Sequence, residues 1–156
     1  MDKQKLPMRT GVGIIVLNSN NQVFVGKRKD NPGDKWQMPQ GGVDEGEDFI
    51  SAMKRELFEE TSIQNIKIIK EISQIYHYEL PEKLIGVIWK GKFRGQKQKW
   101  FITKFLGNDS EINLNTKHPE FIDWKWIEPK LLPEVIVDFK KDLYLNLLKE
   151  INLVIG

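Results

Sequence analysis

The chain has 156 residues, of which 40% are apolar and 29% charged, with a formal net charge of +2 at pH 7. This length supports one buried core, and the apolar content argues against a disordered chain, so we expect a single domain over residues 1–156. The absence of cysteine excludes disulfides and thiolate metal sites. No apolar stretch suits a membrane span or a signal peptide, which predicts a soluble, cytoplasmic protein with no membrane partner.

The first elements are expected to form a hairpin over residues 11–28. An apolar run at 12–17 is followed by the turn-like residues Asn18–Asn21 and by a second strand over 22–27. A polar loop over 29–35, which contains Pro32 and Gly33, and an extended segment over 36–42 come next.

A helix is expected over residues 47–61. Runs rich in isoleucine or alternating aromatic and polar residues then predict strands at 66–78, 84–89, 100–106 and 121–127. From residue 133 to 151, Ile136, Phe139, Leu143 and Leu147 recur at helical spacing, which predicts a second amphipathic helix. Strands combined with two helices predict an α/β (α+β) architecture in which a mixed sheet packs between helices.

Residues 41–63, GGVDEGEDFISAMKRELFEETSI, carry the strongest chemical signal. Glu56, Glu59 and Glu60 span an arc of about 100° near the end of the predicted helix. Their charges repel one another, and the last turn of a helix disfavours negative charge. A hard divalent cation with oxygen ligands would offset both effects.

A solvated acidic face is the common explanation for such a cluster. Here, however, apolar residues lie beside and between the glutamates, and Phe58 lies on the far side of the helix, so we expect the helix to be packed on several sides. Arg55 precedes Glu59 by four residues and can hold its carboxylate in one rotamer. Glycines ahead of the helix allow a carbonyl or a phosphate to approach closely. These features favour a cleft lined by carboxylates.

The same segment resembles the Nudix box, G-x5-E-x7-R-E-U-x-E-E-x-G-U, in which U is a bulky aliphatic residue. The matching residues are Gly41, Glu47, Arg55, Glu56, Leu57, Glu59, Glu60 and Ile63. Ser62 replaces the last glycine, at a position that is expected to end the helix in a left-handed conformation. The resemblance implies the Nudix α/β/α sandwich.

The resemblance also implies a Mg²⁺-dependent hydrolase of phosphoanhydride bonds. Two or three ions would neutralise phosphate oxygens and lower the pKa of a bound water. As in other Nudix enzymes, the metal ligands would be the main-chain carbonyl of Gly41 and the carboxylates of Glu56, Glu59 and Glu60. Resemblance to the bacterial subgroup named below adds Glu120, the glutamate of its PEF segment. Mn²⁺ remains an alternative to Mg²⁺.

The implied catalytic set is Glu60, Glu56, Glu59, Arg55 and Glu120. Glu47 and Arg55 would fix the loop and orient Glu59. The residues leave open which glutamate is the general base; we favour Glu60, with Glu120 second.

Outside the box, the chain resembles one bacterial subgroup, the RNA 5′-pyrophosphohydrolases and the similar dinucleoside polyphosphate hydrolases. The segments WQMPQGG, GQKQKWF, PEF and FKKDLY carry this resemblance. It implies that Phe139 stacks on a base and that Lys140 approaches a phosphate. The remaining substrate-side positions that match are Arg9, Arg28, Tyr78, Lys97 and Lys99.

Simpler explanations exist for some of these residues. By position alone, Phe139 fits an apolar helix stripe that faces the core. Lys97 and Lys99 belong to a basic run over residues 90–104 that could be a solvated face, although its interleaved aromatic residues suit a phosphate backbone and stacked bases. Trp124 and Trp126 are expected to be core-facing strand residues.

The expected reaction is removal of pyrophosphate, or of successive phosphates, from 5′-triphosphorylated RNA to leave a 5′-monophosphate. Asymmetric hydrolysis of diadenosine tetraphosphate to ATP and AMP is the alternative, because the loop over residues 29–35 is longer than in the RNA enzymes and flanks the nucleotide site. A non-catalytic module that binds nucleotides or RNA is a third possibility. We expect no DNA partner and favour a monomer.

Overall fold

The structure is a computed structural model that describes residues 5–30 and 33–156. Asn31 and Pro32, in the predicted polar loop, lie outside the described residues. The chain forms a six-stranded mixed sheet in the order β4-β5-β1-β2-β6, and a short strand, β3, pairs with β1. The strands are β1 (Met8–Leu17), β2 (Val23–Arg28), β3 (Gln40–Gly42), β4 (Ile66–Glu79), β5 (Gly95–Phe105) and β6 (Phe121–Ile127).

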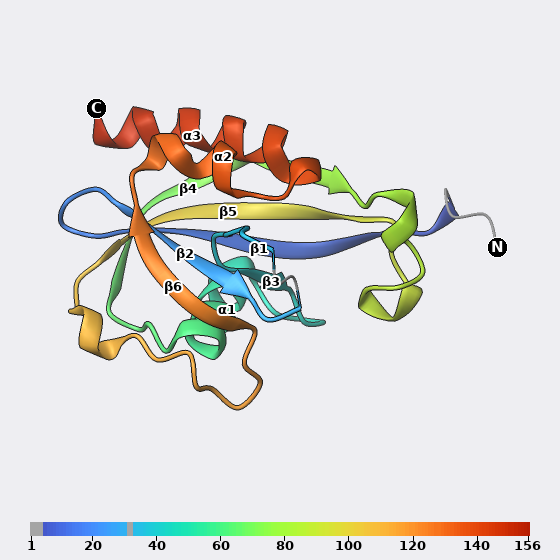
Figure 1. The fold of residues 1–156 in the computed structure, drawn as a ribbon, viewed down its shortest axis with the longest axis horizontal. Helices are drawn as coiled ribbons and strands as arrows, with labels where there is room; N and C mark the ends of the chain where they lie inside the picture. Colours follow the sequence, from blue (N-terminus) through green and yellow to red (C-terminus); the bar gives the residue numbers. More distant parts are fainter. Residues whose placement is uncertain (1–4, 31–32) are drawn as a thin grey trace.

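Helices cover both faces of this sheet (Figure 1). Helix α1 (Phe49–Thr61) packs on one face, and α2 (Leu132–Val135) and α3 (Lys141–Ile155) lie on the other. Each face has its own buried core: Leu57 and Phe101 belong to the α1 side, whereas Trp100 and Tyr144 belong to the α3 side. The predicted sandwich is therefore confirmed. In the described part of the chain, no helix has the length and apolar character needed to cross a bilayer.

The predicted hairpin forms from β1 and β2, which pair in antiparallel fashion from Leu17 and Val23. Asn18 stabilises the turn, because its side-chain oxygen accepts hydrogen bonds from the backbone of Asn20 and Gln22. β1 begins three residues before the predicted hairpin, since Met8 and the residues after it pair in parallel with β5. This parallel pair places the two longest central strands side by side.

Helix α1 begins at Phe49, two residues after the predicted start, because the side chain of Asp48 caps the backbone N–H of Ser51 at 2.7 Å. It ends at Ser62, whose φ of 66° is left-handed. The position therefore has the backbone conformation expected where the Nudix box carries glycine. The expectation that α1 is packed on several sides is wrong at Phe58, which is 46% exposed.

The predicted strand over residues 84–89 is wrong. The segment between β4 and β5 instead forms short 3₁₀ turns at Glu82–Leu84 and Trp89–Gly91. Gly86 has a φ of 89°, which interrupts any extended run. The strand predicted at 100–106 in turn begins earlier, at Gly95, because the polar residues of β5 pair with both β1 and β4.

The predicted single helix over residues 133–151 is also wrong. The chain is extended at Ile136 and Val137, between α2 and α3. Three consecutive β-branched residues, Val135–Val137, lower helix propensity there. The backbone carbonyl of Val135 is used instead to accept a hydrogen bond from Trp36 N at 2.8 Å. Ile136, Leu143 and Leu147 are nevertheless all buried in the same core, as their spacing suggested.

Candidate active site

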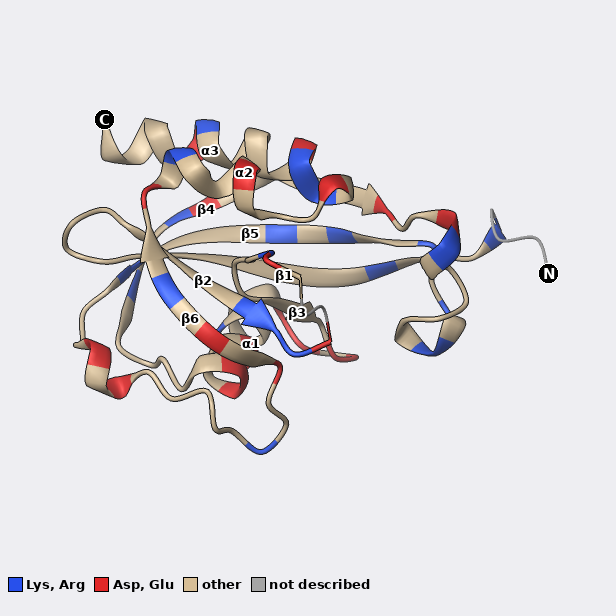
Figure 2. Cartoon of the chain, in the orientation of Figure 1, with Lys and Arg blue, Asp and Glu red and all other residues tan. Residues whose placement is uncertain are grey.

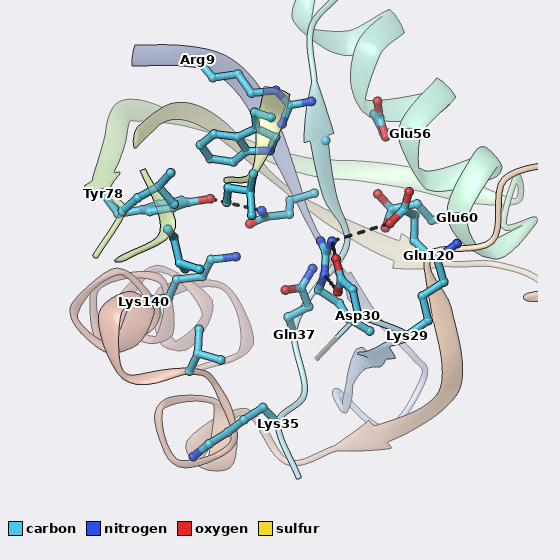
Figure 3. Close-up of a pocket in the computed structure, with 18 of the residues that line it drawn as sticks. Arg9, Lys29, Asp30, Lys35, Gln37, Glu56, Glu60, Tyr78, Glu120 and Lys140 are labelled. Atoms are coloured by element: carbon cyan, nitrogen blue, oxygen red, sulfur yellow. Dashed lines mark hydrogen bonds and ion pairs between the residues drawn. The ribbon is translucent and has the colours of Figure 1, made fainter. Parts of the chain in front are cut away.

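A pocket of about 1570 Å³ opens where the carboxyl-terminal half of α1, β3, the turn just before α3 and the segment after β4 meet. Glu56, Glu60 and Glu120 lie on one side of it, and Tyr78 and Lys140 lie on the opposite side (Figure 3). The pocket thus joins an acidic wall to a wall of aromatic and basic side chains.

Arg55 organises the acidic wall. Its Nε and Nη2 donate to the two carboxylate oxygens of Glu47 at 2.8 and 2.9 Å, and Nη2 also donates to the carbonyl of Gly42 at 2.9 Å. Its Nη1 donates to Glu56 at 2.9 Å and to Glu59 at 3.2 Å. The hydrogen bonds from Arg55 lower the pKa of Glu47 to about 2. The expected contact with Glu59 is therefore present, as one of several made by this guanidinium.

Gly41 allows the carboxylate of Glu56 to lie against the main chain. A Cβ at residue 41 would be 2.1 Å from Glu56 Oε2, so any larger residue would push that carboxylate away. Burial raises the pKa of Glu56, and its hydrogen bond from Arg55 opposes this shift. The carbonyl of Gly41 accepts a long hydrogen bond of 3.4 Å from Gln96.

Glu60 is the most buried of these acidic residues, with 6% of its surface exposed. Burial, followed by the nearby charge of Glu56, raises its pKa well above the ordinary value for glutamate. Among the described residues no lysine or arginine forms an ion pair with Glu60. A buried carboxylate of this kind is stabilised either by a proton or by a cation.

The donor set suits a hard divalent cation in its chemistry. In the part of the chain that the structure describes, however, no three acidic or histidine side chains stand close enough together to hold a metal ion. Glu56 and Glu59 each form an ion pair with Arg55. Carboxylate oxygens, a carbonyl beside Glu56 and the uncompensated Glu60 still fit Mg²⁺, which binds oxygen ligands.

Arg28 also lines the pocket and lies beside the acidic wall. It ends β2 and makes two hydrogen bonds to Asp30, at 2.8 and 2.7 Å, while its Nη2 lies 3.7 Å from Glu120. The hydrogen bond from Arg28 lowers the pKa of Asp30. Asp30, which the sequence analysis did not single out, therefore holds the guanidinium of Arg28 at the pocket wall.

A buried chain of hydrogen bonds runs beneath the pocket. Gln40 Nε2 donates to the Tyr78 hydroxyl at 3.3 Å, and that hydroxyl donates to Gln96 Oε1 at 3.1 Å. Gln98 Nε2 donates to Gln40 Oε1 at 3.1 Å, and Gln98 Oε1 accepts from Trp100 Nε1 at 2.9 Å. Burial raises the pKa of Tyr78 to about 12, so its hydroxyl remains protonated.

Phe139 and Lys140 form the far wall. The ring of Phe139 lies 5.8 Å from that of Tyr78, centroid to centroid, and both line the pocket. Lys140 Nζ lies 5.1 Å from the centroid of the Tyr78 ring, and burial lowers the pKa of Lys140 to about 7. In residues 5–30 and 33–156, no carboxylate forms an ion pair with this ammonium group. Phe139 also packs against the core, as its place on an apolar stripe suggested, while its contact with a base stays a prediction.

Arg9 lies at the third side of the pocket, above the glycines of β3. A Cβ at Gly42 would be 2.4 Å from Arg9 Nη2, which shows how closely the guanidinium approaches this loop. Its carbon Cζ lies 5.2 Å from the centroid of the Trp89 ring. Burial lowers the pKa of Arg9.

The structure does not bring Lys97 and Lys99 into the pocket. Along β5, Gln96, Gln98 and Trp100 face the α3 side and the pocket floor, so the alternating lysines face the α1 side of the sheet. Lys99 Nζ lies 3.5 Å from Glu71. Figure 2 shows basic residues along β5 and acidic residues on α1.

Sequence reasoning missed several residues that lie in the pocket or beneath it. The spacing of GQKQKW already implied that Gln96, Gln98 and Trp100 share one face of a strand, which was a usable signal. Trp89 gave no such signal, because its segment was assigned to a strand. Thr116 was also missed: it lines the pocket, and its hydroxyl is the one buried side-chain oxygen or nitrogen in the described residues without a hydrogen-bond partner.

Comparison with known proteins agrees with this geometry. Residues 7–147 match the NUDIX domain. A Pelagibacter ubique (strain HTCC1062) protein described as RNA pyrophosphohydrolase is 56% identical over 151 residues, which span 97% of this chain and 96% of that protein. A Rickettsia conorii (strain Malish 7) protein with the same description is 47% identical over 145 residues, covering 93% of this chain and 90% of that one.

Solved structures share the fold at low sequence identity. The E. coli dihydroneopterin triphosphate pyrophosphohydrolase has a TM-score of 0.71 at 20% identity, over 94% of this chain and 99% of that one. A C. elegans Ap4A hydrolase has a TM-score of 0.64 at 21% identity, over 88% of this chain and 94% of that one.

Proposed function

The chain belongs to the Nudix family of phosphoanhydride hydrolases, and on this premise we propose that it is an RNA 5′-pyrophosphohydrolase. The observation that carries the proposal is the pairing of two walls in one pocket, carboxylates on one side and Phe139, Tyr78 and Lys140 on the other. A phosphate chain needs the first wall and a nucleotide needs the second. Similarity to relatives described as RNA pyrophosphohydrolases, at 56% and 47% identity, supports RNA as the substrate.

In the proposed reaction, water attacks a phosphorus of the 5′-triphosphate and one phosphoanhydride bond breaks. Pyrophosphate, or phosphate in successive steps, leaves, and the RNA retains a 5′-monophosphate. We assign proton acceptance from the water to a carboxylate oxygen of Glu60, with Glu120 as the second candidate. Burial raises the pKa of Glu60, and a higher pKa makes its carboxylate a stronger proton acceptor, which supports this role.

Nudix hydrolases generally use divalent metal ions, typically Mg²⁺. Here two or three ions would be held by Glu56, Glu59, Glu60, Glu120 and the Gly41 carbonyl, with Mn²⁺ as a possible substitute. When bound, such ions neutralise phosphate oxygens and acidify a coordinated water. Arg55 contributes by fixing the carboxylates, and Arg9 and Arg28 contribute positive charge toward the phosphates.

The nucleotide side would use Phe139 as a stacking surface and Lys140 as a phosphate contact. Stacking on an aromatic ring stabilises a bound base by about 1–3 kcal/mol, and the half-buried ring of Phe139 lines the pocket. Lys97 and Lys99 would contact RNA only beyond the pocket, on the other face of the sheet. If the substrate is the 5′ end of a transcript, the reaction takes place in the cytoplasm. We also propose that residues 1–156 form one functional domain.

One observation keeps dinucleoside polyphosphates as a second candidate. The pocket continues past the carboxylates to Phe58, Thr116 and His118, at the end of α1 and in the loop before β6. Phe58 is 46% exposed there, and Thr116 has the unpartnered hydroxyl. A second nucleoside of diadenosine tetraphosphate could occupy this arm, whereas the triphosphate end of an RNA would leave it free.

The deciding experiment compares initial rates on 5′-triphosphorylated RNA, diadenosine tetraphosphate and a nucleoside triphosphate at equal concentration. We expect the RNA to be hydrolysed fastest with Mg²⁺, and activity to disappear on chelation. Faster hydrolysis of diadenosine tetraphosphate would replace the proposal with the second candidate. Binding of RNA without any phosphate release in Mg²⁺ would instead indicate a non-catalytic module.

A further inference from the structure

Trp89 has a backbone conformation that aromatic residues rarely adopt. Its φ is 52°, and Lys90 and Gly91 follow with φ values of 57° and 72°. A left-handed conformation is easy for glycine, but it costs free energy for a bulky side chain and persists only where the surroundings enforce it. Such strain at a pocket wall points to a positioning role for the strained residue.

The surroundings of this turn do enforce it. At its base, Leu80 N donates to Arg94 O at 2.8 Å and Arg94 N donates to Pro7 O at 3.1 Å. Within the turn, Lys92 N donates to Trp89 O at 3.2 Å. The apolar side chains of the segment, including Ile85 and Ile88, pack against the α3-side core. The turn is therefore anchored both to the start of β1 and to the core.

The result is that the indole of Trp89 lies at the pocket wall beside Arg9. The guanidinium carbon of Arg9 is 5.2 Å from the ring centroid, within the range of a cation–π contact. Phe93 supports the indole through an edge contact, with centroids 6.3 Å apart and planes at 76°. Lys90 is the other non-glycine residue of the turn with a left-handed backbone conformation, and it does not line the pocket.

Arg9 needs such a support because no acidic side chain holds it. In the described residues 5–30 and 33–156, Arg9 makes no ion pair, and its Nη2 packs on Gly42 of β3. A carboxylate partner would orient the guanidinium but would also neutralise it. An aromatic face orients the guanidinium and leaves its charge and its donors available for a phosphate.

We propose that Trp89 is a positioning residue that holds Arg9 in place for the phosphate chain of the substrate. The proposal rests on the proposed function for the identity of that substrate. The left-handed backbone conformation of Trp89 is what places its indole at this point of the pocket wall. Trp89 acts through Arg9 and makes no contact with the reacting atoms.

The test uses two substitutions with the same effect on the backbone. Asparagine tolerates a left-handed conformation, so Trp89→Asn and Lys90→Asn both relieve strain in one turn. We expect Lys90→Asn to retain full activity on 5′-triphosphorylated RNA. Trp89→Asn also loses packing against the α3-side core, so its melting temperature should fall; we expect the variant to remain folded at the assay temperature and its kcat/KM to be about tenfold lower, the effect of losing one partly desolvated cation–π contact.

A double-mutant cycle with Arg9→Ala separates positioning from a merely structural role. If Trp89 acts through Arg9, Trp89→Asn has no further effect once Arg9 is alanine. Trp89→Phe, which retains an aromatic face, should restore most of the activity. Equal losses for Trp89→Asn in both backgrounds, or an equal loss for Lys90→Asn, would overturn the proposal.

A binding measurement keeps this test independent of the proposed function. Inorganic tripolyphosphate, titrated calorimetrically into each variant, reports on the phosphate site without any hydrolysis of RNA. Trp89→Asn should weaken its binding about tenfold and Lys90→Asn should leave it unchanged. If the three proteins bind tripolyphosphate as expected but wild type does not hydrolyse RNA, the proposed function fails while the role of Trp89 stands. Unchanged binding in Trp89→Asn would refute that role.

Discussion

Arg55 donates two hydrogen bonds to the carboxylate of Glu47, at 2.8 and 2.9 Å, and so ties the loop ahead of α1 to the middle of that helix. The same guanidinium reaches Glu56, Glu59 and the carbonyl of Gly42. One planar side chain with fixed donors therefore sets the positions of both the acidic residues and the glycine loop.

Arg55→Lys should disrupt this arrangement, because an ammonium group cannot make parallel hydrogen bonds to Glu47 while also reaching Glu56. We expect activity to fall about 10- to 100-fold, with a higher Mg²⁺ concentration needed for half-maximal rate. A Mg²⁺ titration of initial rates measures both. Lys54→Arg, at the exposed neighbouring position, is the control and should behave like wild type. An unchanged Mg²⁺ dependence in Arg55→Lys would contradict the role assigned to Arg55.

Glu60→Gln should abolish most activity and leave the fold intact. Glutamine has the same shape but cannot accept a proton or hold a cation strongly, so the rate should fall by about 10²–10⁴. Since burial raises the pKa of Glu60, removing its charge should maintain or raise the melting temperature. Glu45→Gln, in the exposed loop, is the matched control. Near-normal turnover in Glu60→Gln would exclude Glu60 as both base and ligand.

Phe139→Ala should impair hydrolysis of 5′-triphosphorylated RNA more than that of free nucleoside triphosphates. The Phe139 ring lines the pocket 5.8 Å from Tyr78, where a base of the RNA can stack. A stacked base is stabilised by about 1–3 kcal/mol, which predicts a rise of KM for RNA of roughly tenfold or more. Parallel kinetics on the two substrates give the ratio. Equal losses would mean that Phe139 serves the core alone.

Lys97→Ala with Lys99→Ala should not affect hydrolysis of a nucleoside triphosphate, because both side chains face away from the pocket. If these lysines contact RNA outside it, the double variant should weaken binding of long RNA only and reduce its salt dependence. Affinity measured at several salt concentrations, for a short and a long RNA, checks this. A loss of activity on the nucleoside triphosphate would show that Lys97 or Lys99 does act in the pocket.

Lys140→Met should stabilise the protein in a pH-dependent way. The pKa of Lys140 is lowered from 10.5 to about 7 by burial, so the folded state holds this proton less tightly than the unfolded state. Below pH 7 both states carry the charge, and its burial destabilises the fold fully. Between pH 7 and 10.5 the folded state loses the proton and wild-type stability rises; above 10.5 the penalty is absent.

We therefore expect the free energy of unfolding of Lys140→Met to exceed that of wild type by a few kcal/mol near pH 7. Each unit by which the pKa of Lys140 is lowered corresponds to about 1.4 kcal/mol. The difference should vanish near pH 10.5. Urea denaturation at a series of pH values measures it. Lys141→Met, at the exposed neighbouring residue, should show no such trend. A constant difference across the series would argue against a buried, neutral Lys140.

Most of the acidic wall followed from the sequence because its geometry is local. The helix period alone puts Glu56, Glu59 and Glu60 on one arc, and a spacing of four residues brings Arg55 to Glu59. The hairpin and β6 were predicted for the same reason, since turn residues and alternation act over a few positions.

The remaining features depended on contacts between distant segments. Alternation in β5 separates Lys97 and Lys99 from Gln96 and Gln98, but it cannot say which set meets the pocket. That choice depends on the packing of α1 on one face of the sheet and α3 on the other. The break at Ile136 likewise required the hydrogen bond from Trp36 to Val135, and the turn at Trp89 is held by Arg94 and the core. Sequence periodicity specifies which side chains point together, whereas only the packed sheet and helices determine what lies opposite them.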